Sequence, residues 1–168
     1  MTPDRRGSAV IEFPSDLEIL ITRDFDAPIA LVFDVFTKPE HVRKTFAPFG
    51  EEVTECSIDL RVGGSYHFVF IRDDGTEMSF RGTYLEVEPP FRTVQTWLYE
   101  GWPDAEAVES MDLQETDGVT RLTHRLTFRD EAGRAHMTRF DGTEASFDNI
   151  ETYLRSLQDP RRVASLSP

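Results

Sequence analysis

The stretch GTEASFDNIETYLRSL, residues 142–157, decides the fold that we expect for this chain. Mainly apolar side chains recur at spacings of three and four, which places them along one face of a helix. This stripe consists of Phe140, Thr143, Phe147, Ile150, Leu154 and Leu157. The other faces carry polar side chains, namely Glu144, Asp148, Glu151 and Arg155. We predict a long amphipathic C-terminal helix, secure from about Thr143, that packs one face against a sheet.

The sequence before this helix alternates between apolar and polar residues in short runs that are typical of β-strands. We predict seven strands, at Leu17–Arg23, Glu51–Leu60, Ser65–Arg72, Thr76–Val87, Thr93–Tyr99, Val108–Glu115 and Thr120–Phe128. Turn-forming residues separate several of them: Gly63-Gly64, Asp73-Asp74-Gly75, Pro89-Pro90 and Asp117-Gly118. Because such short connections join antiparallel neighbours, the last six strands form a meander.

Two short helices follow the first predicted strand. Pro28 suits the first turn of a helix that runs to about Phe36. Thr37 and Glu40 have the spacing of a capping box, which starts a second helix that ends near Thr45. A sheet with one apolar face must bury it, and the C-terminal helix is the only long partner. We therefore predict an α+β fold in which a curved antiparallel sheet wraps around that helix and leaves space for a ligand, with the two short helices closing one end.

Composition limits the classes of partner. The net charge of −13 disfavours nucleic acid and membrane surfaces as partners. Cys56 is the only cysteine, so no intrachain disulfide can form, and a reducing, cytoplasmic location is expected. We find neither an apolar run of about 20 residues nor a secretory signal in MTPDRRGSAVIEF. The expected domain plan is a flexible lead-in at residues 1–15, one domain at 16–158 and a tail at 159–168.

The sequence offers little catalytic chemistry. Among the four histidines, His124 shares the inward face of its predicted strand with Leu122 and Leu126, where it could be a hydrogen-bonded core residue, a polar anchor or a general base. Cys56 is interpreted as a small buried hydrophobe. We predict no catalytic residue, metal site or cofactor, because nucleophile elbows, phosphate loops and paired histidines are missing from the sequence. The pair Glu51-Glu52 and the cluster of Asp104, Glu106 and Glu109 are interpreted as solvated charges.

Thirteen mostly aromatic or apolar residues are candidates for lining a ligand cavity, although each could equally belong to an ordinary core. They are Phe33, Phe46, Tyr66, Phe68, Phe70, Met78, Phe80, Trp97, Met111, Leu113, His124, Phe140 and Phe147. Trp97, Tyr99 and Trp102 could also gather near a sheet edge, which would permit a homodimer.

Several motifs resemble the family of bacterial proteins similar to the activator of the heat-shock protein 90 ATPase, within the START-like (SRPBCC, helix-grip) superfamily. The resemblance rests on four segments between Leu17 and Leu157 that occur in the family's order: RDFDAP at 23–28, VFDVFTKPEH at 32–41, DLRVGGSY at 59–66 and GTYLEVEPP at 82–90. Thr45-Phe46 depart from the family pattern, which has a pair of tryptophans there and places it near the cavity mouth.

The resemblance implies three functions. The first is binding of a small hydrophobic or aromatic molecule in a cavity between sheet and helix, because START-like folds hold lipids, polyketides or plant hormones there. The second is enzymatic, a polyketide cyclase, aromatase or hydrolase, which needs His124 or Tyr66 to reach the cavity with a polar partner. The third is a protein-interaction module with a chaperone partner, by analogy with ATPase activation.

Overall fold

The computed structural model describes residues 4–138 and 142–159. Its strands form one antiparallel sheet in the order β1-β2-β8-β7-β6-β5-β4-β3. The strand bounds are β1 Val10–Glu12, β2 Glu18–Phe25, β3 Glu52–Ile58, β4 Ser65–Ile71, β5 Glu77–Glu88, β6 Arg92–Tyr99, β7 Ala107–Thr116 and β8 Val119–Phe128. The helices are α1 Ile29–Thr37, α2 Pro39–Thr45, α3 Glu131–Met137 and α4 Gly142–Gln158.

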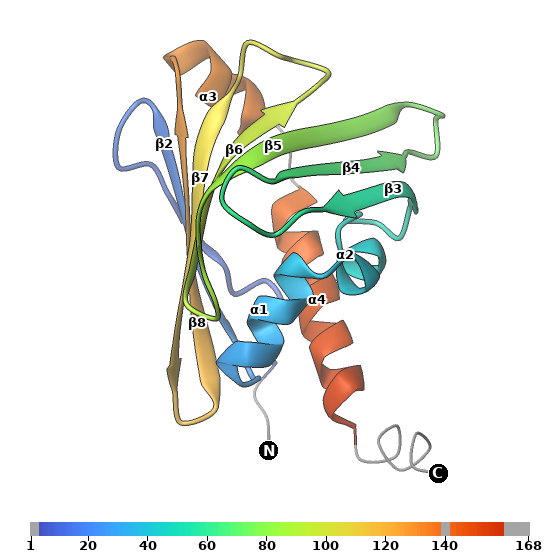
Figure 1. The fold of residues 1–168 in the computed structure, drawn as a ribbon, viewed down its shortest axis with the longest axis vertical. Coiled ribbons are helices and arrows are strands. Elements are labelled where there is room, and N and C mark those ends of the chain that lie inside the picture. Colours follow the sequence, from blue (N-terminus) through green and yellow to red (C-terminus); the bar gives the residue numbers. More distant parts are fainter. Residues whose placement is uncertain (1–3, 139–141, 160–168) are drawn as a thin grey trace.

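The sheet curves around α4. In Figure 1, β2, β7 and β8 run nearly vertically, whereas β3, β4 and β5 turn across the view and pass over the helix. Two irregularities accompany this bend, one between Val53 and Glu55 in β3 and one between Tyr84 and Glu86 in β5. Such bulges increase the local bend of a strand. The predicted helix-grip fold is confirmed.

A close backbone approach lies beside the second bulge, at Gly82 in β5. A Cβ atom on Gly82 would collide with the backbone oxygen of Thr96 in β6 and would stand 2.6 Å from the hydroxyl of Tyr66 in β4. Only glycine gives room for this approach. The sequence prediction of either a bulge or close packing at Gly82 is therefore confirmed in its second form.

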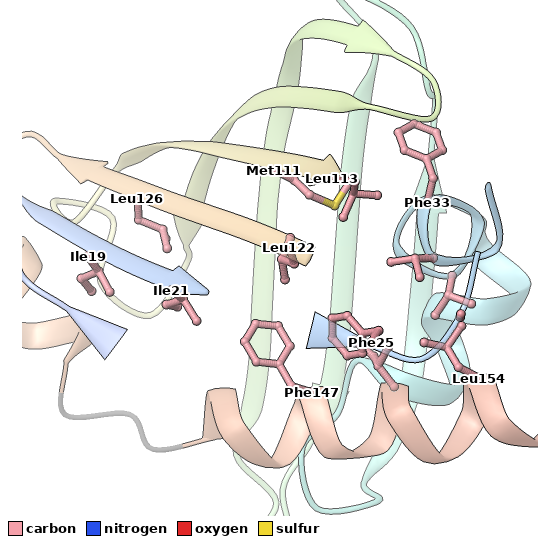
Figure 2. Close-up of a cluster of buried hydrophobic side chains, with 14 of the residues drawn as sticks. Ile19, Ile21, Phe25, Phe33, Met111, Leu113, Leu122, Leu126, Phe147 and Leu154 are labelled. Carbon is pink, nitrogen blue, oxygen red and sulfur yellow. The ribbon is translucent and has the colours of Figure 1, made fainter. Parts of the chain in front are cut away.

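The hydrophobic core fills the space between α4 and the strands β2, β7 and β8. Alternate residues of β2 face inward, so that Ile19, Ile21 and Phe25 are buried. Phe147 and Leu154 project from α4 toward them, as Figure 2 shows. Phe25 meets Phe147 edge to face, with ring centroids 6.1 Å apart. The predicted apolar stripe of α4 is thus confirmed for the part of it that the structure describes.

A buried ion cluster also joins sheet and helix. Arg23 faces inward from β2, and its side chain is 0% exposed. Its guanidinium donates to Glu151 at 2.9 Å, to Asp148 at 3.0 Å and to Glu144 at 3.3 Å. At spacings of four and three, the three acidic residues share one face of the helix, which the sequence identified only as polar. We call this group the Arg23 clamp.

Two short elements are present that the sequence did not predict. The lead-in contains regular structure that the sequence analysis did not predict, because Val10–Glu12 pair with Leu20–Thr22 as β1. The short helix α3 was also missed, although its N-cap Asp130 accepts a hydrogen bond from the amide of Gly133 at 2.7 Å. Of the predicted tail, residues 160–168 lie outside the described residues.

The predicted capping box does not form. Thr37 is the last residue of α1, and its hydroxyl donates to the carbonyl of Phe33, four residues back. The helix α2 begins at Pro39 after the extended residue Lys38, which makes no side-chain cap. A proline at the first helical position needs no capped amide of its own, so the two helices meet with a single extended residue between them.

Among the described helices, none has the length and apolar character needed to span a membrane.

Candidate functional site

A cavity of about 260 Å³ lies between the concave face of the sheet and α4. The strands contribute residues from β2 and from β4 to β8, and α4 contributes Thr143, Ser146, Phe147 and Ile150. Residues from α1 and α2 also line the cavity, and the expectation that these helices close one end of it stays a prediction. The volume is near the lower limit of about 300 Å³ for small-molecule pockets. The cavity therefore suits a compact ligand.

Seven of the thirteen predicted residues line this cavity. They are Phe46, Tyr66, Phe68, Trp97, Met111, His124 and Phe147. Most of them carry rings, and the rings make direct contacts with one another, such as Phe46 with Phe68 at a centroid distance of 4.9 Å. Phe46 and its neighbour Thr45, which stand where the resembled family has two tryptophans, both contribute to the lining. Whether these residues contact a ligand stays a prediction.

The other predicted residues do not line the cavity. Phe33 and Leu113 belong to the main core, where Figure 2 shows both of them. Phe70, Met78 and Phe80 pack together in a second core cluster around Ala47. Alternation along a strand identifies the inward face, but it does not separate the side chains that fill the core from those that border empty space. Phe140 lies outside the described residues.

A polar cluster occupies the sheet side of the cavity. Glu109 of β7 accepts a hydrogen bond from the Gln95 amide of β6, with Nε2 and Oε1 2.6 Å apart. Its other carboxylate oxygen lies 3.0 Å from Nε2 of His124 in β8. Gln95 pairs directly with Glu109 across β6 and β7. His124 in β8 is the diagonal neighbour of Glu109 on its other side. Three adjacent strands thus bring an amide, a carboxylate and an imidazole together in otherwise apolar surroundings.

The carboxylate of Glu109 is held in its ionised form. Burial would raise the pKa of Glu109, but attraction to His124 and hydrogen bonds from His124 and Gln95 oppose it. These stabilising effects outweigh burial, so the pKa of Glu109 lies below its ordinary value. The cavity therefore contains a buried negative charge at neutral pH.

The prediction that Glu109 is a solvated charge is wrong. Its side chain is only 14% exposed, and the residue lines the cavity. The signal was present in the strand period: Glu109 and Met111 are two residues apart in β7, so they face the same side. Gln95, which the sequence analysis did not single out, is found by the same rule from Trp97 in β6. The charge of Glu109 alone favours an exposed position, whereas its place in the alternation of β7 puts the side chain on the inward face.

Tyr66 is unsuited to acid–base chemistry. Its hydroxyl donates to the backbone carbonyl of Thr96 at 2.7 Å, and burial raises the pKa of the phenol far above its ordinary value. The same effect raises the pKa of Tyr84. Of the two residues that the enzyme hypothesis requires in the cavity, His124 is the one with a polar partner suited to proton transfer, namely Glu109.

The remaining histidines make contacts away from the cavity lining. His67 faces the other side of β4 from Tyr66 and lies between Glu55 and Glu100. His41 makes a 2.6 Å hydrogen bond to the hydroxyl of Tyr153, and His136 stacks on Trp102. Across the described residues, no group of three or more His, Cys, Asp or Glu side chains could hold a metal ion.

The three aromatic residues that suggested a homodimer lie in different surroundings. Trp97 lines the cavity, and Tyr99 packs against the second core cluster. Trp102 is 43% exposed and stacks on His136 with ring centroids 4.3 Å apart. The three rings therefore do not form one exposed patch as expected, and a homodimer stays a prediction.

A second, more open hollow of about 530 Å³ lies beside α2 and α4. Most of its lining is polar or charged, including Arg43, Lys44, Glu51 and Asn149. The amide of Asn149 donates to the carbonyls of Ala47 and Pro48, so this side chain holds a loop in place. None of the predicted cavity residues borders this hollow, and we place the candidate site in the inner cavity.

Comparison with solved structures supports the fold over nearly the whole chain. A protein from Rhodobacter sphaeroides is 21% identical, with a TM-score of 0.80 over 89% of this chain and 99% of its own. Protein Ms6760 from Mycobacterium smegmatis is 20% identical, with a TM-score of 0.77 over 87% and 96%. Protein NE0264 from Nitrosomonas europaea is 24% identical, with a TM-score of 0.75 over 87% and 99%. At these identities the similarity demonstrates a shared fold.

No curated protein sequence matches the chain significantly. A family model does match, and it covers residues 26–155, which include α1, α2, the strands β3 to β8 and most of α4. The matched region contains Gln95, Glu109 and His124 together with the aromatic lining. This chain belongs to the family described as Activator of Hsp90 ATPase homolog 1-like protein.

Proposed function

We propose that this protein binds a small, largely apolar molecule in the cavity between the sheet and α4. The observation that carries the proposal is the cavity itself: an unfilled volume of about 260 Å³ with many aromatic side chains and a single polar cluster. Apolar walls with a few converging polar groups are the usual composition of small-molecule sites. Aromatic side chains supply large contact areas for a ligand that contains rings.

The test uses naphthalene as a compact ring probe and a variant that fills the cavity. Ser146 and Thr152 both lie in α4, and each hydroxyl donates to a backbone carbonyl. Ser146 borders the cavity, whereas Thr152 is exposed. Ser146→Phe should abolish saturable naphthalene binding, and Thr152→Phe should retain it. Native mass spectrometry of freshly purified protein would then identify a natural ligand that copurifies.

Two results would contradict binding in this cavity. Absence of saturable naphthalene binding by the folded wild-type protein would oppose the proposal. Equal binding by wild type and Ser146→Phe would show that the probe binds elsewhere. Far-ultraviolet circular dichroism of each variant provides the control for folding.

General-base catalysis is a second candidate function, and the His124–Glu109 pair favours it. A carboxylate that accepts from one imidazole nitrogen orients the ring and leaves the other nitrogen available for a proton. With a bound ester, Nδ1 of His124 would take a proton from an attacking water. Hydrolysis of 2-naphthyl acetate should then exceed the buffer rate and fall in His124→Asn. A rate that is the same with and without protein would reject this candidate.

The chaperone-partner hypothesis stays a prediction. Its test is the rate of ATP hydrolysis by the chaperone with saturating amounts of this protein, and an unchanged rate would count against it.

A further inference from the structure

Two buried polar atoms at the sheet side of the cavity have no hydrogen-bond partner among the described residues. They are Oε1 of Gln95 and Nδ1 of His124. Gln95 is only 8% exposed, and its Nε2 is already engaged with Glu109. The carboxylate accepts only, so it fixes the amide orientation and leaves Oε1 as a spare acceptor. A buried acceptor without a partner is unfavourable, and native proteins seldom retain one.

The histidine next to Gln95 adds a second spare position. Its Nε2 lies 3.0 Å from Glu109, so that nitrogen carries the proton of the hydrogen bond. In a neutral imidazole the other nitrogen, Nδ1, is then an acceptor. The cavity therefore presents Oε1 of Gln95 as an acceptor in either protonation state of His124, and Nδ1 of His124 as a second acceptor when the imidazole is neutral.

Other polar side chains in the cavity wall are already used by the protein. The hydroxyls of Thr37, Thr45 and Ser146 donate to backbone carbonyls. The Tyr66 hydroxyl donates to the carbonyl of Thr96. Among the buried side-chain nitrogen and oxygen atoms of the described wall, Oε1 of Gln95 and Nδ1 of His124 are the ones without a partner.

The charge of the cavity narrows the choice of ligand. No lysine or arginine is among the described residues that line it, whereas Glu109 is ionised and buried. A ligand carboxylate or phosphate would meet the Glu109 carboxylate, and the basic side chain of the described wall, His124, is already engaged by that carboxylate. An uncharged hydroxyl group would instead satisfy a spare acceptor without adding charge.

We propose that the ligand is an uncharged aromatic alcohol whose hydroxyl group donates a hydrogen bond to Oε1 of Gln95. This proposal rests on the proposed function, since it names the chemical class that the same cavity selects. The aromatic wall holds the ring system, and the Gln95–Glu109–His124 cluster recognises the hydroxyl. Selectivity against anionic ligands then follows from Glu109.

The test compares three probes with the same ring system: 2-naphthol, 2-methylnaphthalene and 2-naphthoate. The methyl group matches the hydroxyl in size but cannot donate, and the carboxylate carries a charge. Gln95→Met removes the acceptor and keeps the side-chain length. Gln114→Met is the matched control, because Gln114 lies on the exposed part of β7. Affinities are read from the shift of the Trp97 indole signal in nitrogen–proton NMR spectra.

The decisive quantity is the preference for 2-naphthol over 2-methylnaphthalene. It should fall about tenfold in Gln95→Met, the equivalent of one hydrogen bond, and stay unchanged in Gln114→Met. Taking this ratio between proteins cancels the difference in hydrophobicity between the probes. 2-Naphthoate should bind at least about tenfold more weakly than 2-naphthol, because the buried charge of Glu109 opposes it.

The results distinguish a failure of the proposed binding function from a failure of the hydroxyl proposal. If all three probes fail to bind, the proposed function fails. If they bind and the preference is the same in wild type and Gln95→Met, the cavity is a binding site but the hydroxyl proposal is wrong. Tighter binding of 2-naphthoate than of 2-naphthol would also overturn it. The comparison of the three probes on the wild-type protein remains decisive if Gln95→Met does not fold.

Discussion

Arg23 in β2 and Glu151 in α4 form an ion pair that the protein shields from solvent. The Arg23 side chain is 0% exposed and that of Glu151 is 4% exposed, with Nη2 and the carboxylate oxygen 2.9 Å apart. The two residues are 128 positions apart in the sequence. Their pairing joins the second strand to the last helix, and this helix forms one wall of the cavity.

Removal of one partner of this pair should destabilise the fold severely. Arg23→Met would leave the buried Glu151 carboxylate with only its longer 3.4 Å contact to Arg155, and removal of one partner of a buried pair costs about 3–5 kcal/mol in the free energy of unfolding. Urea denaturation measures the change. Arg121→Met is the matched control, since Arg121 of β8 pairs with Asp24, the neighbour of Arg23 in β2, but is 61% exposed. The free energy of unfolding of Arg121→Met should fall by less than about 1 kcal/mol. Equal losses for both variants would contradict the structural role of the Arg23 clamp.

The polar cluster should make the free energy of unfolding depend on pH in the acid range. The native pKa of Glu109 lies below its unfolded value, which is about 4.3. Its stabilising contribution is therefore complete above that pH and is lost as the pH falls through the lower native pKa. Glu109→Gln should reduce stability at pH 6 by about 1–3 kcal/mol.

The measurement is the difference in unfolding free energy between wild type and Glu109→Gln at several pH values from 6 to 3. The difference should narrow as the solution becomes more acidic, because the protonated glutamate resembles glutamine. A difference that widens below pH 4 would show that the native state favours the protonated carboxyl group, against the geometry of the cluster.

Gly82 should not tolerate a side chain. Gly82→Ala places a methyl group against the Thr96 carbonyl and the Tyr66 ring, and such overpacking costs about 1–3 kcal/mol. Ser65→Ala, at an exposed position in the neighbouring strand, should stay within about 0.5 kcal/mol of wild type. Thermal unfolding of the two variants makes the comparison. If Gly82→Ala unfolds at the same temperature as the wild type, the backbones of β5 and β6 are farther apart at Gly82 than the structure shows.

Cys56 should react as a buried thiol. The side chain is 6% exposed, and burial raises the pKa of the thiol despite a smaller opposing effect of Arg43. Its reaction with a disulfide reagent at pH 8 should be on the order of 100-fold slower in the native protein than in urea. Because it is the only cysteine, the signal is unambiguous. A native rate equal to the unfolded rate would contradict burial.

The sequence predicts the elements with strong periodic signals. The seven predicted strands and α4 begin and end within a few residues of the observed bounds, because their apolar faces must be buried in the sheet and helix interface. The strand β1 has only three residues, which is too short for any period to emerge. The Arg23 clamp depends on contacts between distant segments, and no local pattern encodes such contacts.

The candidate site could be predicted only in part. Strand phase correctly brings Tyr66 and His124 to the concave face, whereas the strand of Trp97 is apolar on both sides and gives no phase. It cannot show that Phe80 fills the core while Phe68 borders a cavity, since that depends on how neighbouring side chains pack. Glu109 was missed because a charged residue was assumed to lie in solvent, although its strand phase placed it inside.

The most direct test of the central claim uses the two tryptophans of this chain as separate reporters. Trp97 lines the cavity, and Trp102 stacks on His136 outside the lining. The variant Trp102→Phe assigns the two indole signals in a nitrogen–proton NMR spectrum. On titration with 2-naphthol, the Trp97 signal should shift saturably while the Trp102 signal stays in place. A Trp97 signal that does not move, or equal and unsaturable shifts of both signals, would contradict ligand binding in this cavity.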